Sequence, residues 1–209
     1  MTPVTATRLR RLVLVRHGET AGQSSIRYFG ATDVPLSGAG RWQMDRVRVA
    51  LATERFDAVY TSCLTRTTEA ARIVAPQLPA HPIAGFNEIN FGQWEGLTRK
   101  EIAARDPQLF HEWRSRFDTF VYPDGDGVSA FRARVVETFR TLLPGMPACV
   151  LAVVHRGVVA SIVTELLDLP GAERSAWPID LASIHMLVAD DGTWHAARVN
   201  DINHLDGQS

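Results

Sequence analysis

The chain has 209 residues, and its 22 basic and 23 acidic residues give a net charge of −1. A chain of this length can bury about 70% of its unfolded surface in one domain. We therefore expect a single domain over residues 1–209, with 1–10 and 206–209 flexible. The balanced charge offers no global field to attract nucleic acid or an acidic membrane, so any anion must be bound locally.

The cysteines and the apolar runs predict a cytoplasmic protein. Cys63 and Cys149 form no CxxC or Cys/His ligand spacing, which suits thiols in a reducing compartment. The basic start is followed by an apolar run of only 12–15, too short for a signal peptide. The longest apolar run, 148–154, is far shorter than the roughly 20 residues of a membrane span. Monomer and homodimer both stay open.

Strand-like and helix-like patterns alternate along the chain, which favours an α/β fold with a mostly parallel central sheet flanked by helices. The predicted strands are 12–15, 56–62, a short one around Ile83, 148–154, and a hairpin of 183–189 with 193–199. The predicted helices are 37–52, 64–75, 99–117, 129–143 and 158–169. Ser37 is the candidate N-cap of the first helix, and the breaker-rich 121–127 ends a helical excursion over the sheet.

Two of the predicted strands end in a histidine beside an arginine. In "LVLVRHG" the pair is Arg16 and His17, and in "CVLAVVHRG" it is His155 and Arg156. Burying a cation at the end of a strand costs solvation free energy unless a nearby anion compensates its charge. Ligands of an open parallel sheet bind at the carboxyl ends of its strands, so the two histidines face each other there if their strands are neighbours.

Arg66 lies in the first turn of the helix after the intervening strand, where the helix dipole also favours an anion. Several cationic or donor groups around one point suit a phosphoryl group, whose oxygens match the fork of an arginine. A neutral histidine held at its other ring nitrogen can attack phosphorus. The residues alone predict a phosphate site, and they leave open whether it reacts or binds. For each histidine taken singly, the alternative is a satisfied polar residue at a strand end.

Four features resemble the histidine phosphatase superfamily, branch 1, the phosphoglycerate mutase-like proteins, in the family's order and over nearly the whole chain. They are "LVRHGET", "SCLTR", "EINFGQWEG" and the second strand-end histidine, His155. The resemblance implies a phosphoglycerate mutase-like three-layer sandwich. It also implies that His17 is phosphorylated, that Arg16 and Arg66 bind phosphate, and that Glu88 is the proton donor.

Three positions depart from the family's pattern. Gln23 stands where the family commonly has Asn, and its longer amide remains a candidate phosphate donor. Arg156 stands where a glycine is common, and either turns to the surface or reaches over the pocket toward the substrate. Asp126 and Gly127 replace a common Glu and Ser. The resemblance therefore implies intact chemistry and an altered specificity.

The implied reaction is phosphoryl transfer in two steps, with no cofactor and no metal. His17 attacks phosphorus while Glu88 protonates the leaving oxygen, and Glu88 then directs water at the phosphohistidine. Arg16, Arg66 and His155 stabilise the equatorial oxygens. We predict a metal-independent phosphomonoesterase acting on a small phosphorylated metabolite. Ribazole phosphate, sugar phosphates and phosphoglycerates are all used by relatives.

Two other functions stay open. Mutases of this family usually carry a longer, proline-rich insertion after the glutamate motif, and segment 111–125 lacks one. A catalytically silent phosphate or phosphoprotein binder needs neither a nucleophile nor an acid, so the presence of both His17 and Glu88 speaks against it. Turnover of a generic aryl phosphate separates an enzyme from a binder.

The remaining reactive or aromatic residues are interpreted as structural. Trp94 is predicted to be a packing residue, and Cys63 a small buried thiol rather than a nucleophile. For Glu88, the alternative to a proton donor is an exposed turn carboxylate. The other histidines share no ligand spacing and are interpreted as structural or solvated: His81, His111, His185, His195 and His204.

Overall fold

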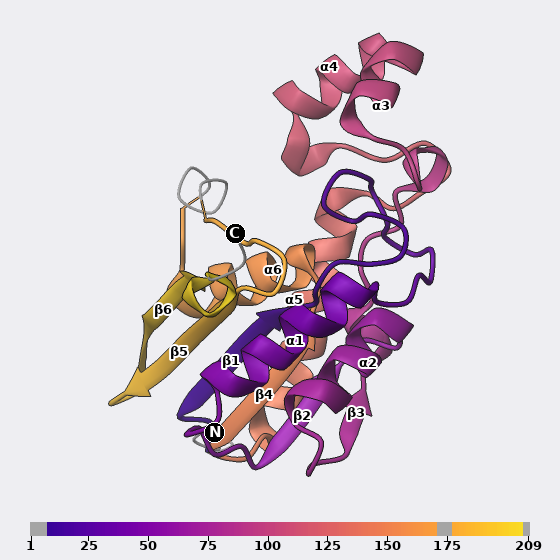
Figure 1. Cartoon of the computed structure of the whole chain (residues 1–209). Helices are drawn as coiled ribbons and strands as arrows, with labels where there is room; N and C mark the ends of the chain where they lie inside the picture. The colour runs from indigo at the N-terminus through magenta and orange to yellow at the C-terminus, as the bar shows by residue number, and fades with distance from the viewer. Residues whose placement is uncertain (1–7, 171–176, 207–209) are drawn as a thin grey trace, which may run out of the picture.

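The computed structural model describes residues 8–170 and 177–206. Within them, six strands form one sheet in the order β3-β2-β4-β1-β5-β6 (Figure 1). Strands β1 to β4 pair in parallel, whereas β5 and β6 extend the sheet as an antiparallel hairpin. The strands are β1 Arg11–Arg16, β2 Ala58–Thr61, β3 Ala80–Pro82, β4 Cys149–Val154, β5 Ile184–Asp190 and β6 Thr193–Asp201. The predicted mostly parallel sheet is confirmed.

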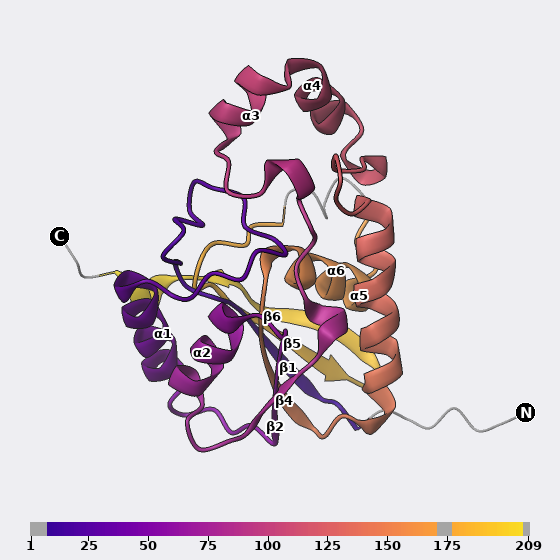
Figure 2. The ribbon, with the colours of Figure 1, turned by 90° about the vertical axis from the view of Figure 1, so that its right-hand side faces the viewer.

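Helices cover both faces of the sheet, which gives three layers (Figure 2). One face is covered by α1 and α2, and the opposite face by α5 and α6, while α3 and α4 lie beyond the sheet. The helices are α1 Gly38–Ala50, α2 Thr65–Val74, α3 Arg99–Arg105, α4 Pro107–Ser115, α5 Val128–Leu142 and α6 Arg156–Leu167. In the described ranges, none of the helices has the length and apolarity needed to cross a membrane.

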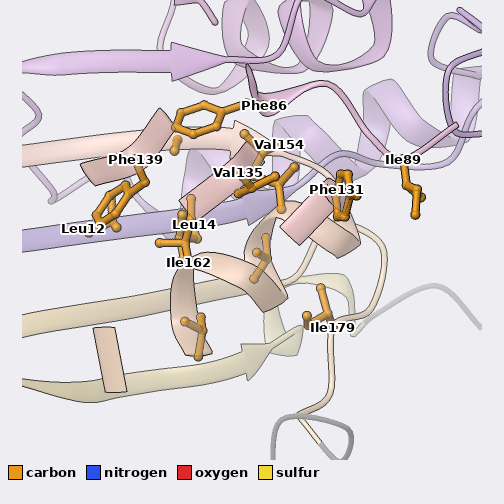
Figure 3. Close-up of a cluster of buried hydrophobic side chains, with 14 of the residues drawn as sticks. Leu12, Leu14, Phe86, Ile89, Phe131, Val135, Phe139, Val154, Ile162 and Ile179 are labelled. Carbon is orange, nitrogen blue, oxygen red and sulfur yellow. The ribbon is translucent and has the colours of Figure 1, made fainter. Parts of the chain in front are cut away.

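Strand β1 shows why the central strands are apolar at every position. Its successive side chains point to opposite faces. Leu12 and Leu14 join the hydrophobic cluster beneath α5 and α6, whereas Val13 and Val15 join the cluster beneath α1 and α2. Figure 3 shows the first cluster, which continues to Ile179 at the end of β1. Because both faces are buried, the strand places its carboxyl end inside the molecule.

Two local predictions are confirmed by their backbone geometry. Ser37 caps α1, since its Oγ accepts a hydrogen bond from Gly40 N at 3.0 Å. The β5–β6 hairpin turns at Asp191 and Gly192, with φ of 48° and 82°. A tight hairpin turn needs such left-handed residues, and glycine adopts them without steric cost.

Two predicted elements differ from those observed. The short strand ends at Pro82 and excludes Ile83, whose amide bonds back to the Thr61 carbonyl at 2.8 Å. The single helix predicted over 99–117 is two helices, because Pro107 disfavours helical backbone at the residue before it. Asp106 accordingly has φ −129° and ψ 61°, and the chain changes direction between α3 and α4.

The ordered chain begins earlier than predicted. Leu9 is fully buried in the cluster beneath α5 and α6, and Arg10 N donates to the Ala148 carbonyl at 2.8 Å. These contacts show that the flexible start predicted over 1–10 does not extend to Leu9 and Arg10. At the other end, Asp206 N bonds to the Asn203 carbonyl at 3.2 Å. The rest of the predicted flexible ends, 1–7 and 207–209, lies outside the described residues.

Candidate active site

The carboxyl ends of β1 and β4 bring the two strand-end histidines together. The strands pair in parallel with Arg16 opposite Val154, so His17 and His155 follow on neighbouring strands. Both side chains are buried, and their ring centroids lie 5.2 Å apart. Strands β2 and β3 lie to one side of this pair and β5 and β6 to the other. Such a reversal of strand order is where open α/β sheets bind ligands.

His17 is held as a neutral ring with one free nitrogen. Its Nδ1 lies 2.7 Å from the Gly18 carbonyl, which can only accept, so Nδ1 carries the proton. Burial, reinforced by the positive charges of Arg66 and Arg16, holds the pKa of His17 well below its ordinary value. The lone pair therefore lies on Nε2, as a histidine nucleophile requires.

His155 is fixed by a chain of hydrogen bonds from α2. Arg66 Nε donates to its Nδ1 at 3.3 Å, so the proton of the neutral ring lies on Nε2, 2.8 Å from Ser62 Oγ. Burial, and then the charge of Arg66, hold the pKa of His155 well below its ordinary value. Ser62 Oγ also accepts from Leu64 N at 3.1 Å and lies 2.8 Å from Thr67 Oγ1. Ser62 is the first residue of "SCLTR", and its contact with His155 was not predicted from the sequence.

Arg66 is fully buried, and the loop 29–32 holds it in place. Its guanidinium donates to the carbonyls of Gly30 at 2.7 Å and Thr32 at 2.9 Å. The amides of the same loop bond to the carboxylate of Glu95, at 3.0 Å from Gly30, 3.0 Å from Ala31 and 3.3 Å from Thr32. The loop thus bridges a buried cation and an anion. Glu95 was missed from sequence, although it lies within "EINFGQWEG".

Arg16 has a buried donor without a protein partner. Its NH1 donates to the Ile179 carbonyl at 2.9 Å, but no described residue accepts from its buried Nε. Burial first, and the charge of Arg156 second, lower the pKa of Arg16 to about 10, so it stays protonated at neutral pH. An unsatisfied buried cationic N–H is costly, and a bound anion would satisfy it.

Glu88 lies at the edge of the same site, held by two backbone amides. Its Oε1 accepts from Ile89 N and its Oε2 from Gly157 N, each at 3.0 Å. A Cβ added to Gly157 would lie 2.5 Å from Oε1, so only glycine lets α6 approach the carboxylate this closely. The carboxylate is buried and is not the exposed turn residue of the alternative interpretation.

Two adjoining cavities open at this point, with volumes of about 660 and 590 Å³. Arg16, His17 and Glu88 line the first cavity, and Arg156 lines both. Gln23 lines neither: it is exposed, in a left-handed turn with φ 66°. Of the predicted substrate-binding residues, Arg16 and Arg156 line the cavities. Gln23, Arg66 and His155 line neither, and Arg66 and His155 are fully buried.

Of the predictions for Cys63, Trp94 and His185, the one for Cys63 is wrong. Cys63 is exposed in the turn between β2 and α2, so the prediction of a buried thiol is wrong. Trp94 is fully buried and packs against Phe120, as predicted. His185 is a buried structural residue that accepts from Trp177 Nε1 at 3.2 Å. Across 8–170 and 177–206, no three His, Cys, Asp or Glu side chains gather as a metal site would require.

Known proteins resemble the chain over most of its length. The family model "Histidine phosphatase superfamily (branch 1)" matches residues 12–202. An adenosylcobalamin/alpha-ribazole phosphatase of Salmonella typhimurium is 33% identical over 190 residues, which cover 89% of each chain.

Two solved structures share the fold. One is a putative alpha-ribazole-5'-P phosphatase from Escherichia coli, with a TM-score of 0.83 and 26% identity over 93% of this chain and 97% of that one. The other is a mycobacterial glucosyl-3-phosphoglycerate phosphatase complexed with VO3, with a TM-score of 0.79 and 28% identity over 91% and 98% of the two chains. The family model's match and the paired strand-end histidines agree, and the chain belongs to branch 1 of the histidine phosphatase superfamily.

Proposed function

We propose that the chain is a metal-independent phosphomonoesterase that hydrolyses a small phosphorylated metabolite through a phosphohistidine on His17. The observation that carries the proposal is the state of His17. Its ring is neutral and buried, Nδ1 is held by the Gly18 carbonyl, and Nε2 is free at a cavity that Arg16 and Glu88 also line. A histidine that only bound phosphate would need a proton, not a lone pair, on the nitrogen that faces it.

In the first step, His17 Nε2 attacks phosphorus, a P–N bond forms and the P–O ester bond breaks. Glu88 gives its proton to the leaving oxygen, so that an alcohol departs. The unpartnered Nε–H of Arg16 and the guanidinium of Arg66 bind the equatorial oxygens, where charge must be stabilised. The two arginines supply the positive charge that a metal ion provides in other phosphatases.

His155 is the third phosphoryl ligand, and the Ser62 hydroxyl allows it to change tautomer. Its proton lies on Nε2, toward Ser62 Oγ, while Nδ1 accepts from Arg66 Nε. To donate to a phosphoryl oxygen, Nδ1 needs a proton and must give up the hydrogen bond from Arg66. A serine hydroxyl can accept from Nε2–H or donate to a bare Nε2, so it supports either tautomer.

In the second step, Glu88 acts as a base. It takes a proton from a water molecule, the water oxygen bonds to phosphorus, and the P–N bond breaks. Inorganic phosphate leaves, and both His17 and Glu88 return to their starting states. The same carboxyl therefore serves as acid and then as base, which its position at the cavity edge permits.

The residues that line the cavities indicate which kind of substrate the protein binds. Aromatic side chains of the second cavity offer a surface for a flat or apolar alcohol moiety: Tyr28, Phe91, Trp113, Phe117, Phe131 and Trp177. The Salmonella relative is named for alpha-ribazole and the mycobacterial one for glucosyl-3-phosphoglycerate. Both names support a phosphorylated metabolite rather than a protein. A mutase is less well supported, because 111–125 holds only the end of α4 and a short turn, Phe117–Thr119.

Turnover of 4-nitrophenyl phosphate tests the proposal. We expect steady release of nitrophenol and inorganic phosphate by the unaltered protein, and none by His17→Ala. His81→Ala is the matched control, because His81 is exposed on β3, away from the cavities. Phosphate binding without turnover would identify a silent binder. Transfer of the phosphoryl group to 3-phosphoglycerate rather than to water would identify a mutase.

A further inference from the structure

The two cavities carry more positive charge than one phosphoryl group requires. A phosphate monoester brings at most two negative charges, which the proposed function assigns to Arg16 on the cavity wall and the buried Arg66. Among the described residues, the cavity walls hold only two carboxylates, Glu88 and Asp180. The arginines that line the walls are Arg16, Arg27, Arg99, Arg114, Arg132 and Arg156.

Carboxylates neutralise some of these arginines but not those between the cavities. Arg27 pairs with Glu101 at 2.9 Å, and Arg132 pairs with Asp118 at 2.6 Å. In the part of the chain that the structure describes, no carboxylate lies within ion-pair distance of Arg99 or Arg156. Both of these arginines line both cavities, so they lie where the two volumes meet.

Arg99 is held in place by aromatic rings. The carbon at the centre of its guanidinium lies 5.5 Å from the ring centroid of Phe110 and 5.7 Å from that of Trp113. Such cation–π contacts fix the plane of the group and leave its N–H edges free. Arg99 begins α3, the first of the two helices beyond the sheet (Figure 2), and it lines both cavities.

Arg156 begins α6, directly after His155, and is an exposed residue that lines both cavities together with Arg99. Burial raises the pKa of Tyr28, and the charges of Arg99 and Arg156 both oppose that rise. Tyr28 also lines both cavities, so the two cations act on a hydroxyl of the same wall. An anion bound there would be attracted by both charges.

We infer that Arg99 and Arg156 form a second anion subsite, which binds an anionic group carried by the same substrate as the reacting phosphoryl group. The inference rests on the proposed function and narrows its substrate to phosphomonoesters with a further carboxylate or phosphate. The planar forks of the two arginines suit either group. In this assignment the exposed Arg156 acts on the substrate from the cavity wall.

Matched pairs of aryl phosphates test the subsite. The 2-, 3- and 4-carboxyphenyl phosphates are compared with the carbamoylphenyl phosphates, which have the same shape and no charge. In the unaltered protein we expect kcat/KM to favour at least one carboxylate by about 10-fold, because a charge-assisted contact is worth about that much. 4-Phosphonophenyl phosphate extends the comparison, and its rank against the carboxylates shows which anion the subsite prefers.

Variants that remove one positive charge show which arginines cause the preference for the carboxylate substrates. Arg99→Gln and Arg156→Gln should each reduce the carboxylate-to-carbamoyl ratio, and the double variant should bring it close to one. Arg72→Gln is the control: Arg72 is an exposed arginine of α2 that lines neither cavity, so its removal should leave the ratio unchanged. Ratios near one for all pairs in the unaltered protein, or ratios that the double variant retains, would overturn the inference.

A binding measurement separates this inference from the proposed function. Calorimetry compares phenylphosphonate with the 2-, 3- and 4-carboxyphenylphosphonates, none of which can be hydrolysed. We expect at least one carboxylate to bind about 10-fold more tightly, and the double variant to lose that difference. If no ester is turned over but this preference is found, the phosphatase proposal fails and the subsite stands. Equal affinities would refute the subsite, whatever the activity.

Discussion

Replacing Glu95 by Gln tests whether a residue outside the reacting groups positions Arg66. The carboxylate of Glu95 accepts from the amides of Gly30, Ala31 and Thr32, while Arg66 donates to carbonyls of the same loop. Glutamine keeps one oxygen and turns an NH2 group toward N–H donors. We expect the loop to shift, and Arg66 to shift with it.

The expected loss follows from the two oxygens of Glu95. If the glutamine oxygen occupies the Oε1 position, the bond from Thr32 N to Oε2 is lost, as is one of the two from Gly30 N. Leaving such donors facing an NH2 group costs about 1–3 kcal/mol. Complete loss of one donor to the transition state lowers kcat by about 100-fold or more. A displaced Arg66 should lower kcat/KM by about 10- to 100-fold.

A double-mutant cycle is the assay. Glu95→Gln should lower kcat/KM strongly in the unaltered protein and scarcely at all when Arg66 is already Ala, because the carboxylate acts through the guanidinium. Glu165→Gln is the matched control, since Glu165 pairs with Arg140 on the outer surface at 2.7 Å and touches no part of the site. Glu95→Asp should recover part of the activity. Additive losses in folded protein would refute the positioning role.

Three further predictions concern the acid, the metal and pH. Glu88→Gln should slow alkyl phosphates far more than aryl phosphates, whose leaving groups depart without a proton; equal losses would make Glu88 structural. Dialysis against a chelator should leave turnover intact, and a loss restored by one divalent ion would contradict metal independence. Burial lowers the pKa of His17, His155 and His185, the last to about 4, so unfolding takes up protons below about pH 6.5. The free energy of unfolding in urea should therefore fall from pH 7 to pH 5, by up to about 2 kcal/mol per histidine; a flat profile would contradict it.

The centre of the site was predictable because strand ends and short motifs specify it. Apolar runs that stop at Arg16–His17 and at His155 indicate two buried strands, and parallel strands place their carboxyl ends at one edge of the sheet. The position of Arg66 was predictable as well, because it lies in the first turn of the helix after a neighbouring strand. Glu88, by contrast, lies in a turn, and only the resemblance of "EINFGQWEG" pointed to it.

The supporting residues depend on contacts that no local pattern encodes. Glu95 reaches Arg66 through a loop more than sixty residues earlier in the chain, and Ser62 reaches His155 across β2 and β4. The exposure of Cys63 was predicted wrongly because Cys63 lies in the turn after β2 rather than in the buried strand itself. Gln23 lines neither cavity and lies in a left-handed turn, which its sequence neighbours do not indicate.

The measurement that tests the central claim most directly is the chemical nature and position of the trapped phosphoryl group. The protein is mixed with a 32P-labelled substrate, quenched within a turnover in alkali, and digested for mass spectrometry. A phosphoramidate is spared by alkali and lost in acid, so we expect a label with that behaviour on the peptide that holds His17, and none on His17→Ala. A label stable to acid, or one on another residue in a protein that turns over normally, would contradict the account.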